Sequence, residues 1–384
     1  STYSAMADVL RATSMRGRDL HTNLEFHYGL VNWFLGNNIN ARPTTKFIVP
    51  YLTAVGELIE EASRVDLAVA WRILSKELLA AADEAARKSL ADVLEMKQTL
   101  LLRPLQILMD APHLLSGWLS MNKAAFTVTN DRIEWAENPI DVLSDTYHYL
   151  KLDWSPDSPA ANVIWDHDEA ILSNAEDFYR DLEQQLNVET WSDLTHALAG
   201  EAPESFSADQ WLAIQSAHRG FQSGTEILEL LPAMARFTGF YDLSVNSDLS
   251  IHIPERLLDS DHQTAMSKAL APPPTAKSDE IVAVSGGMFY GREAPDVPLY
   301  VQKGDHFNTG DPLYIVEVMK MFNKVYAPFS GTVDEVLVDG DGVIISKGQC
   351  LFKVTPDEQV VIVPADVLAN TRRAHTEQLM KMFL

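Results

Sequence analysis

An internal duplication between residues 281 and 355 limits how this part of the chain can fold. Residues 304–316 align without a gap on residues 342–354, so that glycines meet glycines and apolar residues meet apolar residues. The aligned apolar pairs are Phe307 with Ile345, Leu313 with Leu351, Tyr314 with Phe352, and Val316 with Val354. β-Branched residues alternate in this segment and glycines punctuate it, which is typical of strands and tight turns. The duplication therefore predicts a small all-β sandwich or flattened barrel with pseudo-two-fold symmetry.

Lys320 lies between the two halves, within the stretch VEVMKMFNKV. At this position the pattern predicts the hairpin turn that connects one half to the other. Further upstream, SGGMF aligns with FSGTV through Gly287 and Gly331, but the first half is longer than the second between this glycine and the next aligned one. The surplus residues fall in GREAPDVP, and its prolines and charges predict a protruding loop.

VEVMKMFNKV in this β context resembles the modification site of the biotin carboxyl carrier domains of biotin-dependent carboxylases. In that family, a lysine between two methionines at an exposed hairpin tip carries biotin, and the segment APFSGTV after the lysine matches as well. The resemblance implies that biotin is linked covalently to Lys320 by a biotin protein ligase. The site around it would comprise Glu317, Val318, Met319 and Met321. Val318 is a departure, because the family usually has alanine at this position.

The protruding loop resembles the thumb of carriers of the acetyl-CoA carboxylase type. This resemblance implies an acyl-CoA carboxylase in which biotin shuttles CO₂ as a swinging arm. The implied partners are a biotin carboxylase domain and a carboxyltransferase subunit within a larger oligomeric complex. A carboxylase of pyruvate, another 2-oxo acid or urea stays open, because the transferase decides the acceptor. Two further hypotheses are a lipoyl carrier, which Met319 disfavours because lipoyl domains usually have aspartate there, and a non-enzymatic scaffold with a biotinyl-like docking domain.

The rest of the chain divides by composition. The composition predicts a mainly α-helical interaction and subunit-docking region over residues 53–268. It predicts a proline-rich linker over residues 269–280, ALAPPPTAKSDE. The carrier domain is then expected over residues 281–356, followed by a C-terminal helical tail over residues 357–384. In the helical region, one apolar face is predicted through Leu58, Ile59, Ala62, Val69 and Ile73.

Three local signals refine the helical region. Pro104 is expected to kink or break its helix, because proline lacks the backbone N–H and clashes with the preceding turn. Ser207 and Gln210 have the spacing of a capping box, which predicts a helix start. The segments AFTVTNDRIEW and DLSVNSDLSIHIP have the strand character that the surrounding sequence lacks.

Residues 1–52 resemble the C-terminal end of biotin carboxylase domains. The residues that carry the match are Gly17, Thr22, Asn23, Thr45 and Phe47. Two additional residues, Arg18 and Asp19, interrupt it. The sequence has nothing that resembles the glycine-rich phosphate loop or metal-binding carboxylates of an ATP-grasp enzyme. We therefore expect the chain to be the C-terminal portion of a longer carboxylase and not to be catalytic by itself.

Charge and cysteine content restrict the partners and the compartment. The chain has 30 basic and 54 acidic residues and a net charge of −24, which argues against nucleic acid and anionic membranes as partners. No apolar stretch approaches the length that spans a bilayer. The single cysteine, Cys350, is expected to be an inert packing residue, and its isolation favours a reducing, cytoplasmic environment.

Two motifs invite a functional interpretation that their context disfavours. Met380, Lys381 and Met382 repeat the methionine–lysine–methionine triplet, but in a helical tail where the methionines are expected to pack on a neighbour. The acidic run WDHDE at residues 165–169 could suggest a metal site. Consecutive residues of a helix point in different directions, so we expect a solvated helix start and no metal.

Overall fold

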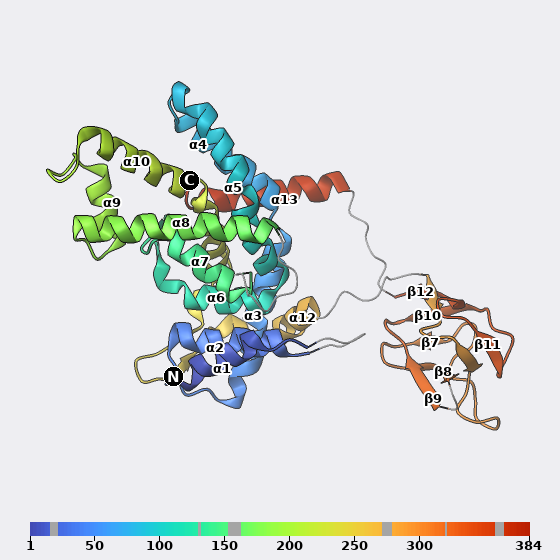
Figure 1. The fold of residues 1–384 in the computed structure, drawn as a ribbon. Helices are drawn as coiled ribbons and strands as arrows, with labels where there is room; N and C mark the ends of the chain where they lie inside the picture. The colour runs from blue at the N-terminus through green and yellow to red at the C-terminus, as the bar shows by residue number, and fades with distance from the viewer. Residues whose placement is uncertain (16–21, 130–131, 153–162, 271–278, 319–320, 358–364) are drawn as a thin grey trace. The chain divides into compact units, whose positions relative to one another are not determined.

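The computed structural model describes residues 1–384 except 16–21, 130–131, 153–162, 271–278, 319–320 and 358–364. The chain forms two compact units (Figure 1): unit 1 is Ser1–Leu270 with Ala365–Leu384, and unit 2 is Ala271–Pro364. Unit 2 is thus inserted into unit 1 in sequence, since the chain leaves unit 1 after Leu270 and rejoins it at Ala365.

Unit 1 is predominantly helical, which confirms the helical region expected from the sequence. Its helices are α1 (Thr2–Ala12), α2 (Leu24–Asn37), α3 (Ile48–Ser63), α4 (Leu67–Ala81), α5 (Glu84–Asp110), α6 (Pro112–Met121), α7 (Pro139–Tyr149), α8 (Val163–Leu186), α9 (Trp191–Ala199), α10 (Ala208–Gln222), α11 (Leu230–Thr238), α12 (Ser260–Leu270) and α13 (Ala365–Met380). The two segments with strand character form small antiparallel hairpins, β1 (Phe126–Val128) with β2 (Ile133–Trp135) and β3 (Ser244–Val245) with β4 (Ile251–His252). Among the described helices, none combines the length and hydropathy needed to cross a bilayer.

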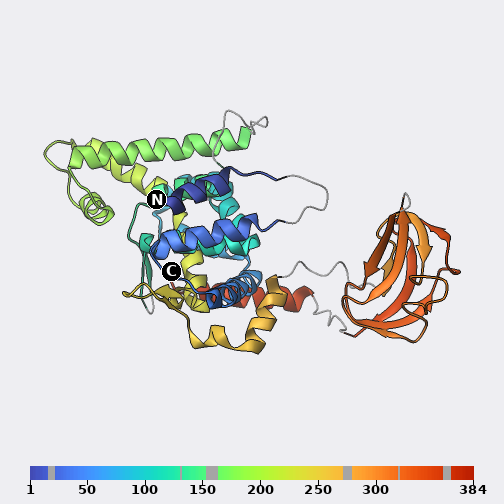
Figure 2. The ribbon, with the colours of Figure 1, turned by 90° about the horizontal axis from the view of Figure 1, so that it is seen from below.

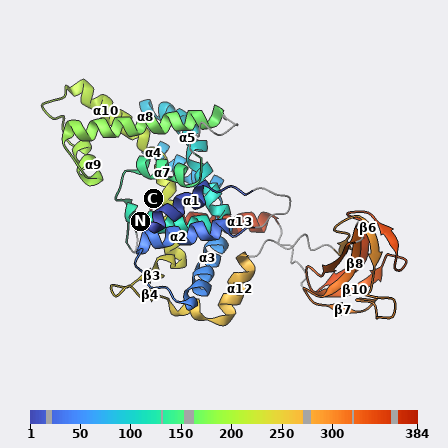
Figure 3. The same ribbon diagram turned by 60° about the horizontal axis from the view of Figure 1, so that its bottom comes forward.

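The core of unit 1 forms around α3, with α12 lying along it (Figure 3). Large side chains from several helices are fully buried there, among them Trp33, Tyr51 and Trp118. α2 packs closely on α6 because glycines line their contact. A Cβ atom on Gly29 would lie only 2.1 Å from the backbone oxygen of His113 in α6. The N-terminal segment is therefore an integral part of the helical core.

The apolar face predicted as one stretch through Leu58 and Ile73 is divided between two helices, so this prediction is wrong in extent. α3 ends at Ser63, and Asp66 starts α4 by accepting hydrogen bonds from the backbone N–H groups of Ala68 and Val69 at 3.0 and 3.2 Å. An aspartate that caps the new helix gives the chain a well-defined corner at this point.

Pro104 does not break its helix, because α5 continues from Glu84 to Asp110. Proline supplies no N–H for the carbonyl of Leu100, four residues earlier. That carbonyl instead accepts a hydrogen bond of 2.9 Å from the hydroxyl of Tyr147 in α7. The predicted capping box is confirmed, since Ser207 and Gln210 each hydrogen-bond the other's backbone N–H.

Unit 2 consists of two four-stranded sheets over one core (Figure 2). The strands are β5 (Glu280–Val282), β6 (Gly287–Tyr290), β7 (His306–Phe307), β8 (Pro312–Val318), β9 (Met321–Tyr326), β10 (Gly331–Val336), β11 (Val343–Ile345) and β12 (Cys350–Pro356). They pair antiparallel in the orders β5-β12-β10-β7 and β11-β6-β8-β9. The aligned apolar residues of the duplication, such as Tyr314 and Phe352, are buried together. No closed sheet is found among the described strands, so the C-terminal β domain is confirmed as a pair of sheets.

Candidate functional site

The β8–β9 hairpin places the predicted modification site at the end of a sheet ladder. Val318, the last residue of β8, pairs directly with Met321, the first residue of β9, and Glu317 pairs with Phe322. By sequence, only residues 319 and 320 connect the two strands. Met319 and Lys320 lie outside the described residues, as do the side chains of Val318 and Met321. Of the predicted site, the described structure therefore contains the complete Glu317 and the backbone pair that flanks the lysine.

A row of side chains crosses the outer face of the sheet beside this hairpin. Strand register aligns Ile344 of β11, Met288 of β6, Glu317 of β8 and Phe322 of β9, which we call the outer row. Its two ends are strongly exposed, with Ile344 at 78% and Phe322 at 63% of their full accessible surface. Large exposed apolar side chains in one row are typical of surfaces that contact partners. The hairpin end is therefore bordered by a mostly apolar row that contains one carboxylate.

Tyr290, two residues after Met288 on β6, holds the Glu317 carboxylate in this row. The Tyr290 hydroxyl donates a 2.8 Å hydrogen bond to Oε2 of Glu317, and its ring centroid lies 5.8 Å from that of Phe322. The hydrogen bond to the carboxylate raises the pKa of the Tyr290 phenol. Tyr290 and Phe322 are absent from the predicted site, although the hairpin register alone would have placed Phe322 opposite Glu317.

The loop predicted from GREAPDVP is exposed through residues 293–299 and is fastened on both sides. Lys324 of β9 approaches Glu293 with its Nζ 3.3 Å from Oε2, and the same Nζ lies 5.5 Å from the ring centroid of Tyr300. The hydrogen bond to Glu293 raises the pKa of Lys324. At the other side, Arg292 forms an ion pair of 2.7 Å with Asp341. The loop is thus tied to the edge strand of the hairpin.

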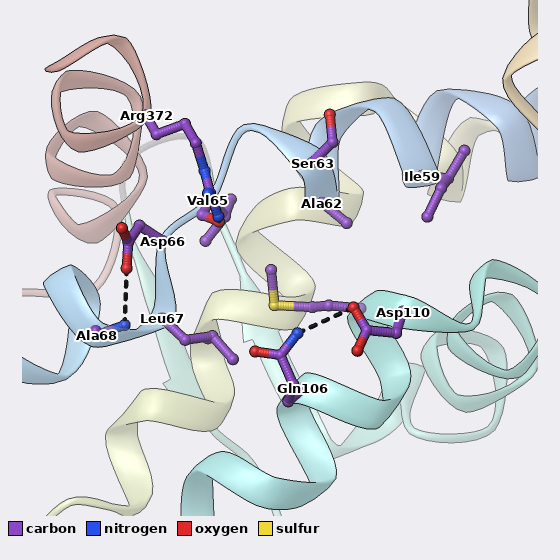
Figure 4. Close-up of a pocket in the computed structure, with 11 residues that line it drawn as sticks. Ile59, Ala62, Ser63, Val65, Asp66, Leu67, Ala68, Gln106, Asp110 and Arg372 are labelled. Carbon is purple, nitrogen blue, oxygen red and sulfur yellow. Dashed lines mark hydrogen bonds between the residues drawn. The ribbon is translucent and has the colours of Figure 1, made fainter. Parts of the chain in front are cut away.

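Unit 1 contains a cavity of about 430 Å³ at the corner between α3 and α4 (Figure 4). Its polar groups serve the fold: Asp66 caps α4, Gln106 donates a 3.0 Å hydrogen bond to Asp110, and Arg372 donates to the Val65 carbonyl at 2.7 Å. The described residues contain no group of three potential metal ligands, and the side chains of residues 165–169 lie outside them.

The second methionine–lysine–methionine triplet is in a different environment. Met380 ends α13 with 1% of its surface exposed and Met382 packs on the core of unit 1, while Lys381 is exposed. The predicted packing of these methionines is confirmed. Cys350 is half-buried, with Sγ 3.6 Å from the carbonyl of Phe352, and burial raises the pKa of its thiol. A raised pKa favours the protonated thiol over the reactive thiolate.

Comparison with known proteins identifies unit 2. Residues 284–354 match the family described as "Biotin-requiring enzyme". Over 121 residues, the chain is 34% identical to the biotin carboxyl carrier protein of acetyl-CoA carboxylase from Chlamydia pneumoniae, covering 31% of this chain and 72% of that protein. The chain belongs to the biotin carboxyl carrier protein family. The protein of the same name from Chlamydia trachomatis serovar D is 37% identical over 79 residues, which are 21% of this chain and 48% of the relative.

Unit 2 is therefore a biotin carboxyl carrier domain homologous to those of acetyl-CoA carboxylase, and its cofactor is covalently bound biotin. A solved single-chain, multi-domain long-chain acyl-CoA carboxylase overlaps 36% of this chain and 13% of its own, at 22% identity and a TM-score of 0.18. The chain covers between about half and three quarters of the length of the two carrier proteins from Chlamydia. The hairpin fits a covalently attached group, because its ladder ends at Val318 and Met321 and the adjoining Phe322 is exposed.

Proposed function

We propose that Lys320 carries the biotin and that the chain is the carrier part of an acyl-CoA carboxylase. The observation that supports this most is the register of the β8–β9 hairpin, in which Val318 pairs with Met321 inside the region that matches the biotin-requiring family. Sequence then leaves Lys320 as the only lysine of the two-residue connection. A lysine at the end of a hairpin can be approached by more than one enzyme without unfolding the domain.

The bound cofactor supplies a ureido nitrogen that holds a carboxyl group, so the protein contributes presentation and positioning. Amide formation at Lys320 removes a positive charge from the hairpin end. The outer row then offers an apolar surface beside the site, and Tyr290 fixes the Glu317 carboxylate within it. Arginine or lysine on a visiting enzyme would be drawn to this carboxylate, because it is the only charge in the row.

The partners that follow from this role are a biotin protein ligase, a biotin carboxylase domain and a carboxyltransferase subunit in a larger oligomeric complex. The relatives are carriers of acetyl-CoA carboxylase, and the fastened loop at residues 291–300 resembles the thumb of that carrier type. Both observations favour an acyl-CoA as acceptor over pyruvate, another 2-oxo acid or urea. The isolated thiol of Cys350 favours the cytoplasm.

We further propose that unit 2 is a flattened barrel-like sandwich with pseudo-two-fold symmetry. Exchanging β5, β6, β7 and β8 with β9, β10, β11 and β12 converts the strand order of one sheet into that of the other. Backbone hydrogen bonds repeat under the same exchange, as in Gly304 N–H to the Val333 carbonyl and Gly342 N–H to the Phe289 carbonyl, both 2.7 Å. The symmetry would place the hairpin at the junction of the halves.

For the remaining chain, we propose that residues 1–52 correspond to the end of a biotin carboxylase domain and residues 53–268 to a subunit-docking region. α2 begins directly after the Thr22–Asn23 match, while Gly17, Arg18 and Asp19 lie outside the described residues. Residues 269–280 would link this region to the carrier at 281–356, and residues 357–384 would follow it as a helical segment.

Parallel modification by two ligases tests the proposal against its alternatives. The chain is incubated with biotin and a biotin protein ligase, or with lipoate and a lipoate ligase, and modification is followed by intact mass. We expect stoichiometric biotinylation and no lipoylation. Lipoylation alone would support a lipoyl carrier, and a chain that neither ligase modifies would support the scaffold hypothesis.

A further inference from the structure

We propose that α13 is a non-covalent anchor that fastens the C-terminal end of the carrier unit to unit 1. The first connection is the chain itself, from α12 to β5. The second is made by the docking of α13, because the chain passes from unit 2 back into unit 1 at Ala365. The purpose of the anchor, confinement of the carrier, rests on the proposed carrier function.

Polar contacts join α13 to the corner between α3 and α4. His375 of α13 and Glu61 of α3 form a hydrogen-bonded pair that is almost completely buried, with side chains 6% and 3% exposed. The hydroxyl of Thr376 accepts a 3.0 Å hydrogen bond from the backbone N–H of Asp66. Arg372 reaches the Val65 carbonyl at 2.7 Å (Figure 4). The contacts of Thr376 and Arg372 satisfy backbone groups where α3 has ended and α4 begins, and where pairing within a helix is impossible.

Apolar contacts bury the C-terminal end of the same helix. Leu379 and Met380 are 0% and 1% exposed and belong to the main core of unit 1. The ring of Phe237 in α11 meets that of His375 edge-on at 5.2 Å, and the Met382 carbonyl accepts a 3.1 Å hydrogen bond from Ile133 of β2. Buried apolar residues around a buried polar pair are the composition of a stable interface. The helix is therefore docked, although a tail could have remained unpacked.

The two connections leave unit 2 side by side. Asp279, just before β5, accepts a 2.8 Å backbone hydrogen bond from Val354 of β12, and Glu280 pairs with Lys353. An extended chain spans at most about 3.5 Å per residue, so residues 271–278 and 358–364 each bridge at most about 30 Å. Two such limits confine the carrier more closely than one limit would. Sites that it serves must lie within the overlap of the two ranges.

Cleavage of the first connection tests the anchor in the full chain. A site for a specific protease replaces residues 273–276, the biotinylated protein is cleaved, and the products are separated by size exclusion at about 10 µM. We expect the fragment that contains unit 2 and α13 to co-elute with the rest of unit 1, held by α13. Complete separation of the folded fragment from unit 1 would overturn the proposal.

A matched pair of substitutions assigns the result to the docked face. Leu379→Asp places a charge in the buried end of α13 and should release the fragment after cleavage, whereas Gln378→Asp at the adjacent exposed position should leave it bound. Uncleaved Leu379→Asp protein should keep the circular dichroism of both units, because α13 is one of many helices. Equal retention of the two variants would contradict the assigned face.

The same fragments separate this proposal from the carrier function. Elution does not depend on the cofactor, and the mass of the fragment reports whether Lys320 is biotinylated. Co-elution of an unmodified fragment would support the anchor and refute the proposed attachment. Separation of a biotinylated fragment would support the carrier and refute the anchor.

Discussion

Substitution of Gly29 by alanine tests whether the N-terminal segment is built into the helical core. A Cβ at this position would lie 2.1 Å from a backbone oxygen of His113, where ordinary contact begins near 3.4 Å. Because the obstructing atom belongs to the backbone of α6, the two helices must move apart by about 1 Å. Overpacking of this kind costs about 1–3 kcal/mol, offset by about 0.5–1 kcal/mol from the better helix propensity of alanine. We expect a net loss of about 1–2 kcal/mol.

Gly220→Ala is the matched control, because it lies within α10 and a Cβ there meets nothing within 4 Å. This variant should be more stable by about 0.5–1 kcal/mol, because alanine has the better helix propensity and no clash opposes it. Urea unfolding of both variants is followed by circular dichroism at 222 nm, which reports mainly unit 1. We expect Gly29→Ala to lower the free energy of unfolding and Gly220→Ala to raise it. If Gly29→Ala stabilised the protein as much as Gly220→Ala, the close packing of α2 on α6 would be refuted.

Three further predictions concern burial and the outer row. Burial raises the pKa of Glu229 to about 9, so the folded state holds a proton that the unfolded state loses near pH 4.5, and stability falls as pH rises between these values. Glu229→Gln should remove this pH dependence. In urea unfolding, it should raise the free energy of unfolding by about 3 kcal/mol at pH 7 but by little at pH 4.5. An equal gain at both pH values would contradict this prediction. His375→Ala leaves the buried Glu61 carboxylate only its 3.7 Å ion pair with Arg64 and should cost about 2–3 kcal/mol, whereas His306→Ala in an exposed pair should cost less than about 1 kcal/mol, by the same assay. Similar costs would speak against the buried pair. Phe322→Ser should raise the KM of the biotin ligase several-fold without changing the melting temperature, and Ile344→Ser, farther from the hairpin along the outer row, should raise it less; the reverse order would remove the outer row from ligase contact.

The carrier domain was largely predictable because its signal is local and repeated. Alternating apolar residues fix which side chains face the core of each strand, and the aligned pair Tyr314 and Phe352 is buried as the duplication predicts. The hairpin between the halves was equally accessible to sequence, since Glu317 and Phe322 follow from a two-residue connection. The contribution of Tyr290 could not be predicted from the sequence, because it depends on which strand lies next to β8.

Most features of the helical region that the sequence did not reveal depend on contacts that are distant in sequence. Pro104 stays within α5 because Tyr147, on another helix, supplies the hydrogen bond that the proline omits. The docking of α13 likewise depends on His375 meeting Glu61, a pairing that no local pattern reveals. The division at Asp66 could have been recognised, because aspartate before an apolar run is an ordinary helix start.

The attachment of biotin to Lys320 is the central claim, and peptide mass spectrometry tests it most directly. The chain is co-expressed with a biotin protein ligase and digested, and Lys320→Arg and Lys381→Arg variants are treated identically. We predict one biotinyl group on the peptide that contains Lys320, its loss in Lys320→Arg and its retention in Lys381→Arg. Biotin on Lys381, or a Lys320→Arg protein that is still biotinylated, would contradict the account.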